Sequence, residues 1–258
     1  MNRVHVRRRT LLDLWRIESL MDYHRLLFDQ PVQAYLQRAK RLGHAPGSLL
    51  AVGASGREAH LLARHPFDRI VLTGVTEPDE VVQETVERDP RVHFEYANAE
   101  RLPYASGSFD LVFCNATLHH LARPVLGLYE ILRVCRRAAV FVEPWECGLG
   151  RTLERIGLAT RYERNQVGNL GGRDNHVYRL NRRGLESLLR SLYLESGFEL
   201  ELQVGWMSTR AQGRKPRWVT RLSALAGWAA SHAPGALGNL ATALVVPGAD
   251  LPPDPTAA

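Results

Sequence analysis

The feature that most constrains the fold of this chain is a series of short apolar segments that alternate with helical stretches. Three of these segments, centred on Leu50, Val71 and Val140, are nearly all apolar. A strand has this composition when helices cover both of its faces, because neither face then meets water. Strands that alternate with helices are typical of parallel βαβ units and not of an all-β sandwich. The pattern therefore predicts a central, mostly parallel sheet.

The predicted elements follow one another along the chain. Strands are expected at residues 48–53, 69–75, 92–98, 109–115 and 138–144. Helices are expected at residues 58–64, 78–87, 124–133 and 181–195. Two later apolar runs, FELELQVGW and LATALVVPG, are expected to close the sheet as an antiparallel pair. Together these elements predict a doubly wound, seven-stranded, Rossmann-like α/β sheet with an antiparallel last strand.

We expect three regions: an N-terminal helical lid at residues 1–43, an α/β domain at residues 44–248 and a flexible tail at residues 249–258. The lid is predicted because apolar residues such as Leu14, Trp15 and Leu36 recur at helical spacing. Pro31 is expected to divide it into two helical segments. The apolar stripe packs in the core or lines an apolar acceptor pocket, and the sequence leaves both readings open.

Composition and charge argue against several classes of protein. The chain is 45% apolar and 23% charged, which is typical of a globular protein. It contains no run near the roughly 18 apolar residues of a membrane-spanning helix and no signal-peptide core, so we expect a cytoplasmic protein without stable membrane insertion. The Trp-bearing stretch RWVTRLSALAGWAASHAPGAL leaves peripheral contact with a membrane surface or a lipid-like acceptor open. The net charge of +6 is scattered, so we expect no nucleic-acid partner.

The three cysteines argue against a metal site. Cys114, Cys135 and Cys147 are odd in number and lack the paired spacing of a zinc site or a disulfide scaffold. We therefore expect free thiols in a reducing compartment and no bound metal. A homodimer is compatible with the sequence.

A turn of small residues follows the first predicted strand of the domain. It consists of Gly53, Ala54, Ser55 and Gly56, and a helix begins at once behind it. Small residues let the backbone approach a ligand closely, and the helix N-terminus is expected to offer unpaired N–H groups. The same four residues also suit a plain tight turn, and they do not match the dinucleotide fingerprint GxGxxG.

The order of the later motifs makes a ligand site the better reading. The stretches LLAVGASGREAHLLA, VLTGVTEPDEVV, FEYANAERLPYASGSFDLVFCNATLHHL and LYEILRVCRRAAVFVEP follow one another over residues 48–145. This series resembles the successive motifs of class I S-adenosylmethionine-dependent methyltransferases of the small-molecule type. The resemblance implies S-adenosylmethionine as the cofactor, bound at the carboxyl ends of the strands, where open α/β sheets bind ligands.

The resemblance also implies a role for individual residues. It assigns the glycine-rich loop to Gly53, Ala54, Ser55 and Gly56, the ribose position to Thr76 or Glu77, the adenine turn to Asn98, Ala99 and Glu100, and the neighbourhood of the reactive sulfonium to Asn115. The chain departs from the family pattern at three positions, because Ala51, Thr76 and Asn98 stand where the family usually has acidic residues. Glu77 is then expected to bind the ribose, and Asn98 the adenine amine.

Three residues are candidates for acid–base catalysis. His119 and His120 follow the fourth strand of the domain, and histidine titrates near neutral pH, which suits a general base. The pair also reads as a helix-entry feature of the resembling family. Glu143 ends the next strand, where it would orient a substrate, act as a second base or cap a neighbouring loop.

A later segment is the candidate for acceptor binding. Asn175, His176, Tyr178 and Arg179 lie in the part of the chain that the resembling enzymes use to cover the acceptor. The same residues also suit a simple junction between a loop and a helix. The sequence thus predicts methyl transfer to a small molecule, at oxygen or carbon, in a biosynthetic pathway. Two alternatives stay open: a binding protein that keeps the fold without transfer, and an RNA methyltransferase.

Overall fold

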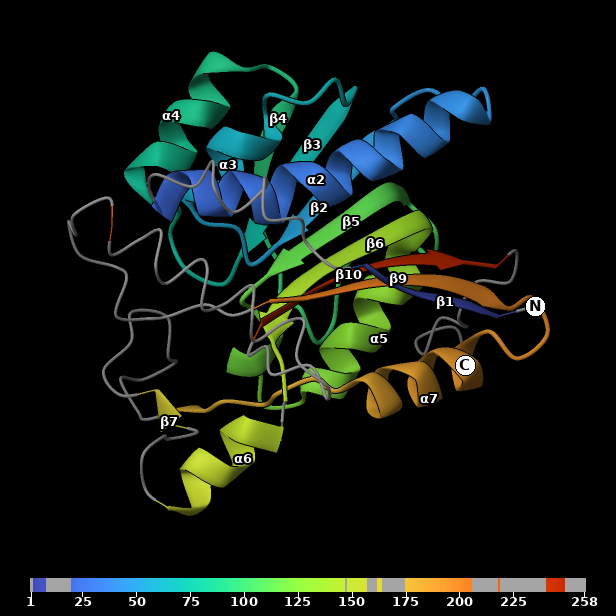
Figure 1. The fold of residues 1–258 in the computed structure, drawn as a ribbon. Coiled ribbons are helices and arrows are strands. Elements are labelled where there is room, and N and C mark those ends of the chain that lie inside the picture. The colour runs from blue at the N-terminus through green and yellow to red at the C-terminus, as the bar shows by residue number, and fades with distance from the viewer. Residues whose placement is uncertain are drawn as a thin grey trace.

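A computed structural model of the chain describes residues 2–7, 20–146, 148–156, 162–163, 175–205, 218 and 240–248. Its centre is a sheet of eight strands in the order β1-β9-β10-β6-β5-β2-β3-β4 (Figure 1). The strands are β1 (Arg3–Arg7), β2 (Ser48–Val52), β3 (Arg69–Gly74), β4 (Val92–Tyr96), β5 (Phe109–Asn115), β6 (Cys135–Pro144), β9 (Phe198–Gly205) and β10 (Leu240–Pro247). A separate short ribbon pairs β7 (Tyr162–Glu163) with β8 (Asn175–His176).

Five of the strands form the predicted parallel part of the sheet. β2 pairs with β3 and β5, β3 pairs with β4, and β5 pairs with β6, all in parallel. β10 is antiparallel to both β6 and β9, which confirms the predicted antiparallel closing pair. The expected strand positions agree with the structure to within three residues at each end.

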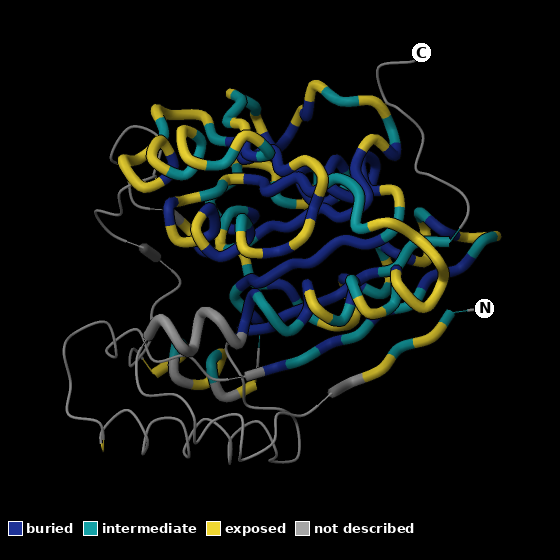
Figure 2. The backbone as a smooth tube through the Cα atoms, turned by 90° about the horizontal axis from the view of Figure 1, so that it is seen from above, coloured by how far each residue is buried: buried dark blue, intermediate teal, exposed yellow. Residues whose placement is uncertain are grey.

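Helices cover both faces of the sheet, as expected of a doubly wound fold (Figure 1). The helices are α2 (Leu20–Arg41), α3 (Gly56–Leu62), α4 (Glu80–Arg88), α5 (Pro124–Val134), α6 (Gly148–Arg155) and α7 (Arg182–Leu192), with a 3-10 turn η1 (Leu118–His120). One apolar cluster joins the sheet to α2 and α3, and the other joins it to α5 and α7. The central strands are consequently buried along nearly their whole length (Figure 2).

The N-terminal part differs from the prediction in two ways. β1 adds an eighth strand, in parallel with β9, which the sequence analysis did not predict. α2 continues through Pro31, so the predicted division into two segments is wrong. Phe28 and Val32, on either side of this proline, are both buried against the sheet, and this packing holds the helix together. Leu14 and Trp15 lie outside the described residues, so the role of the N-terminal region as a lid stays a prediction.

The described part of the chain bears on two further expectations. None of its helices is long and apolar enough to cross a membrane. Cys114 and Cys135 are free and buried, as expected, and Cys147 lies outside the described residues.

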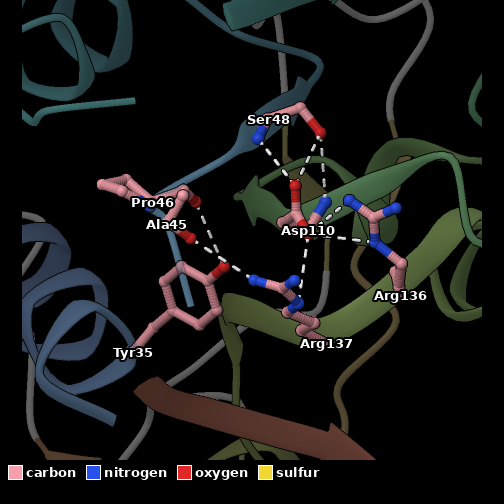
Figure 3. Close-up of polar contacts among 7 residues, drawn as sticks. All are labelled: Tyr35, Ala45, Pro46, Ser48, Asp110, Arg136 and Arg137. Atoms are coloured by element: carbon pink, nitrogen blue, oxygen red, sulfur yellow. Dashed lines mark hydrogen bonds and ion pairs between the residues drawn. The ribbon is translucent and has the colours of Figure 1, made fainter. Parts of the chain in front are cut away.

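A buried carboxylate joins three strands at the edge where β2 begins (Figure 3). Asp110 in β5 accepts hydrogen bonds from the Ser48 backbone N–H at 2.8 Å and from Nε of Arg136 at 3.0 Å. Nε of Arg137 lies 3.2 Å from the same carboxylate. Burial alone would raise the pKa of Asp110, but the Ser48 hydrogen bond and the two guanidinium groups lower it below its usual value. Asp110 therefore fixes β2, β5 and β6 relative to one another.

The surroundings of Asp110 leave no room for other side chains. Gly47 has a φ of +72°, and a Cβ atom there would lie 2.0 Å from Oδ2 of Asp110. Tyr35 in α2 donates a hydrogen bond from its hydroxyl to the carbonyl oxygen of Pro46 at 3.3 Å. Burial, together with the charge of Asp110, raises the pKa of Tyr35 to about 12. The network thus also anchors α2 to the sheet.

We expect Asp110→Asn to lower the free energy of unfolding by about 1 kcal/mol at pH 7, because the buried carboxylate loses the charge that binds two partly exposed guanidinium groups. The folded-state pKa of Asp110 is lowered, so its stabilising effect is present above its unfolded-state pKa and is lost as the pH falls through the folded value. The difference between wild type and variant should therefore shrink below about pH 4. Urea unfolding at pH 7 and pH 3.5 measures both effects. Asp68→Asn changes an exposed carboxylate and should leave the stability unchanged; an equal loss in both variants would contradict the assignment.

Candidate active site

The candidate site lies at the carboxyl ends of the parallel strands. The chain reverses its direction of travel across the sheet at β2, whose neighbours are β3 on one side and β5 on the other. Ligands of open α/β sheets bind at such a reversal, outside the carboxyl ends of the strands. The predicted cofactor residues lie at the carboxyl ends of β2, β3, β4 and β5 or directly after them. The fold therefore brings these loops to one edge of the sheet.

The turn after β2 is closely packed at Gly53. Gly53 has a φ of +67°, and a Cβ atom there would lie 2.4 Å from Oγ1 of Thr117. The Thr117 hydroxyl donates to the carbonyl oxygens of Val52 at 3.2 Å and of Asn115 at 3.0 Å. Only glycine fits at this position, because both the backbone conformation and the space exclude a side chain. The end of β2 and the loop after β5 thus form one unit.

Two carboxylates bind the backbone at the start of α3: Glu58 within that helix and Asp79 just before α4. Neither was predicted from the sequence. Glu58 is 4% exposed, and its Oε2 atom accepts the Ser55 N–H at 3.0 Å, while its Oε1 atom accepts Nδ2 of Asn115 at 2.6 Å. Asp79, before α4, accepts the Gly56 N–H at 2.8 Å. The Ser55 and Gly56 N–H groups are therefore already bound, contrary to the expectation that they are unpaired. The Ser-x-x-Glu spacing of Ser55 and Glu58 is a capping box, a signal that would have found Glu58.

The predicted ribose position is exposed and lies beside apolar surface. Thr76 and Glu77 are both exposed, and two large apolar side chains nearby, Val75 and Tyr96, are 56% and 58% exposed. A hydrogen bond from its hydroxyl to Glu77 raises the pKa of Tyr96. The ends of β3 and β4 are joined here, since the Ala97 N–H donates to the Gly74 carbonyl oxygen at 3.0 Å. Carboxylate and exposed apolar surface together suit a nucleoside.

The predicted adenine turn is held by its own contacts. Oδ1 of the exposed Asn98 accepts the Glu100 N–H at 2.9 Å. Glu100 is buried, and its carboxylate binds the backbone N–H of Arg123 at 2.5 Å and Nε of Arg123 at 2.8 Å. Ala99 is buried in the apolar core. These contacts shape the turn, and a direct role for Asn98, Ala99 and Glu100 in cofactor binding stays a prediction.

Glu143 organises the turn that carries the histidine pair. It is 1% exposed, and its Oε1 atom accepts the backbone N–H groups of Thr117 and Leu118, both at 2.8 Å. Its Oε2 atom lies 2.8 Å from Nδ1 of His119, which is itself buried. Burial, and secondarily the charge of Glu143, raises the pKa of the neighbouring Cys114 thiol. Glu143 thus caps η1 and orients His119, which matches the capping role considered from the sequence.

His120 differs from His119 in its exposure. His120 is half-buried, whereas His119 is 4% exposed, and their ring centroids lie 4.1 Å apart. Of the three residues proposed for acid–base catalysis, His120 is consequently the one that a substrate can reach most directly.

The predicted acceptor segment meets the histidine turn. β8 is in contact with η1, and the Leu180 N–H donates to the carbonyl oxygen of Pro144 at 3.0 Å. His176 is exposed, and Tyr178 is 38% exposed. The structure therefore places Asn175 and His176 beside the loop that carries His120.

Arg179, another predicted acceptor residue, forms an ion pair with α6. Its guanidinium group pairs with the carboxylate of Glu154 in α6, and both side chains are largely buried. The pair fixes α6 against the acceptor segment. Glu154 could not be identified from the sequence, because its spacing from Arg179 carries no local signal.

A shallow, open pocket of about 460 Å³ lies between the first turns of α3 and α4. Its lining residues are Ser55, Gly56, Arg57, His60, Asp79, Glu80 and Val81. It shares Ser55 and Gly56 with the predicted cofactor turn. The hollow therefore borders the strand ends.

Two sequence comparisons agree with this geometry. Residues 50–142 match a family model described as a methyltransferase domain. The curated 27-O-demethylrifamycin SV methyltransferase of Amycolatopsis mediterranei (strain S699) is 34% identical to this chain over 120 residues, which are 42% of this chain and 44% of that protein. The chain thus matches less than half the length of this curated relative.

Solved structures share the fold. An S-adenosylmethionine-dependent methyltransferase from Methanosarcina mazei has a TM-score of 0.51 at 16% identity, over 78% of this chain and 92% of its own. Magnesium protoporphyrin IX methyltransferase from Synechocystis PCC 6803 has a TM-score of 0.51 at 14% identity, over 92% and 94%. The cyclase SpnF has a TM-score of 0.50 at 19% identity, over 85% and 81%. Identities this low establish the fold alone.

The matched residues 50–142 contain most of β2 and β6, all of β3 to β5, and the loops at their carboxyl ends. Residues 50–142 therefore match a methyltransferase domain in sequence, and the chain has the fold of the solved methyltransferases.

Proposed function

We propose that this protein transfers the methyl group of S-adenosylmethionine to a hydroxyl group of a small organic molecule in a biosynthetic pathway. The proposal rests on the hydrogen bonds that join the Gly53 turn, Asn115 and the histidine turn η1 at one edge of the sheet. The curated relative is named for an O-methylation of a small molecule, which favours oxygen over carbon as the acceptor atom. A cytoplasmic location, a homodimer and the absence of a nucleic-acid partner stay predictions.

The residues at this edge fit the proposed cofactor. Gly53 is exposed, so the backbone after β2 is accessible to a ligand. Glu77 offers a carboxylate to hydroxyl groups, and Val75 and Tyr96 offer exposed apolar surface to a flat base. When it is bound, S-adenosylmethionine supplies an electrophilic methyl group on a sulfonium. The protein therefore mainly has to align the acceptor with that group.

The histidine turn is suited to accept the proton of an acceptor hydroxyl. His120 is accessible, and a histidine has the proton affinity that a general base needs near neutral pH. Glu143 holds the backbone of η1 and the ring of His119, so that His119 supports the position of His120. We assign the base to His120, and positioning roles to His119 and Glu143.

The segment that contains His176 and Tyr178 is the proposed acceptor surface. It follows the ribbon strand β8, which contacts η1, and it runs beside the end of β6. Tyr178 presents an exposed ring, and Arg179 is held by Glu154. An aromatic ring beside polar groups suits an organic acceptor with ring systems and hydroxyl groups.

The main alternative is a protein that uses the fold without methyl transfer. SpnF, named as a cyclase, has the same fold, so the fold alone does not define the reaction. Cofactor binding and turnover are therefore tested separately.

We expect the wild-type protein to bind S-adenosylhomocysteine in a calorimetric titration, and Gly53→Ala to abolish this binding. The alanine Cβ atom would meet Thr117 and displace the loop that joins β2 to β5. Gly43→Ala is the matched control, because Gly43 also has a positive φ, +71°, but nothing lies within 4 Å of an added Cβ atom. Gly43→Ala should lose about 1 kcal/mol of stability from backbone strain; Gly53→Ala should lose more because of the contact with Thr117, and only Gly53→Ala should lose binding. No heat with the wild type would contradict the proposed function.

We expect His120→Ala to lower kcat by about 100-fold with little change in cofactor affinity, because a positioned base contributes that much to proton transfer. The assay measures S-adenosylhomocysteine formation with a panel of hydroxylated small molecules that includes 27-O-demethylrifamycin SV. His93→Ala, at an exposed position in β4, should keep the wild-type rate. An unchanged kcat in His120→Ala would remove His120 from the mechanism and leave the methyltransferase function standing.

A further inference from the structure

We propose that Glu58 sets the orientation of the Asn115 side-chain amide, so that the amide oxygen faces the cationic methionine half of the cofactor. The inference rests on the proposed methyltransferase function and assigns a positioning residue to the same site. The resemblance to the family selected Asn115 but gave no role to Glu58.

Glu58 links two elements that lie far apart in the sequence. Its Oε2 atom accepts the Ser55 N–H at 3.0 Å and also the Ser55 hydroxyl, which fixes the carboxylate at the start of α3. Its Oε1 atom accepts Nδ2 of Asn115, at the end of β5, at 2.6 Å. Glu58 is 4% exposed, so these partners take the place of water. The carboxylate is therefore held in one position, and it holds Asn115 in turn.

The chemistry of the two groups determines which way the amide lies. A carboxylate accepts hydrogen bonds and has no hydrogen to donate, whereas the amide of asparagine has a donor end and an acceptor end. Asn115 can therefore bind Glu58 only through Nδ2. Its Oδ1 atom must point away from Glu58, and no residue in the described part of the chain donates a hydrogen bond to it.

This orientation suits a cationic ligand. S-adenosylmethionine carries positive charge on its sulfonium and on its α-ammonium group, and an amide oxygen is the negative end of a dipole. Asn115 is half-buried, and an electrostatic interaction is stronger there than in water. It also adjoins the glycine turn, because Thr117 bonds the carbonyl oxygens of both Val52 and Asn115. With the amide reversed, the NH₂ group would face the cation and weaken binding.

Glu58→Gln removes this constraint with the smallest change in shape. A glutamine can donate its own amide hydrogen to Oδ1 of Asn115, so the Asn115 amide can turn round. We expect the affinity for S-adenosylmethionine to fall about tenfold, the size typical of a lost interaction with a charged group, and the affinity for S-adenosylhomocysteine, whose sulfur carries no charge, to fall by no more than that. Asn115→Ala removes the same oxygen and should weaken binding by a similar factor.

The test is a double-mutant cycle measured by calorimetry on the full chain. If Glu58 acts through Asn115, the variant with both substitutions should bind no more weakly than Asn115→Ala alone. Glu87→Gln, an exposed carboxylate on α4, is the matched control and should bind as the wild type does. Thermal unfolding of each variant identifies a loss of binding that comes from a loss of folding.

Three outcomes would overturn the inference. Wild-type affinity in Glu58→Gln would show that the carboxylate does not position the amide. Losses that multiply in the double variant would show that Glu58 acts independently of Asn115, for example only through Ser55 and α3. If Glu58→Gln does not fold, Asn115→Ala provides the test of the inference, because it leaves the contacts of Glu58 with Ser55 in place. Wild-type affinity in Asn115→Ala would contradict the inference. Failure of the wild type to bind either ligand is a different result, since it contradicts the proposed function itself.

Discussion

The position of β2 between β3 and β5 is the constraint on which the rest of the structure depends. Because β2 pairs in parallel with both neighbours, the carboxyl ends of all three strands meet at one edge. The chain leaves β2 toward β3 and β4 and later returns on the other side through β5 and β6. The loops after these strands therefore gather at the point of reversal, where open α/β sheets bind ligands. Asp110, at the opposite end of β5, holds β2, β5 and β6 together.

Buried carboxylates build the site edge from the inside. Glu58, Glu100 and Glu143 each accept at least one backbone N–H from a loop at the carboxyl ends of the strands. Loops need such partners because their backbone groups have no strand or helix to pair with. Each carboxylate also binds a side chain: Glu58 binds Asn115, Glu100 binds Arg123 and Glu143 binds His119. The carboxylates thus fix both the path of the loops and the side chains that the loops carry.

Much of the fold could be predicted from the sequence, because it depends on local patterns. The apolar runs around Leu50, Val71 and Val140 each form a central strand of the sheet. β1 was missed although Val4 and Val6 alternate with arginine and histidine, as in a half-buried strand, because the segment is only five residues long and its partner β9 lies almost 200 residues away. Pro31 misled the prediction, because burial of α2 against the sheet outweighs the loss of one helix hydrogen bond. Both errors arise from contacts that no local pattern records.

The site shows the same division between local pattern and tertiary contact. The positions of Gly53, Asn98 and Asn115 at the edge of the sheet could be located, because each residue ends a predicted strand. The partners Asp79 and Glu58 could not be found from the spacing that the resemblance used, since they bind across elements. The resemblance emphasised acidic residues missing at Ala51, Thr76 and Asn98. Ala51 is buried in the apolar cluster that also contains Ala59, the neighbour of Glu58, so a carboxylate in α3 reaches this edge without charging the middle of β2. A carboxylate beside the glycine turn is therefore retained, but it comes from a helix, and it acts on a cationic ligand through the Asn115 amide that it orients.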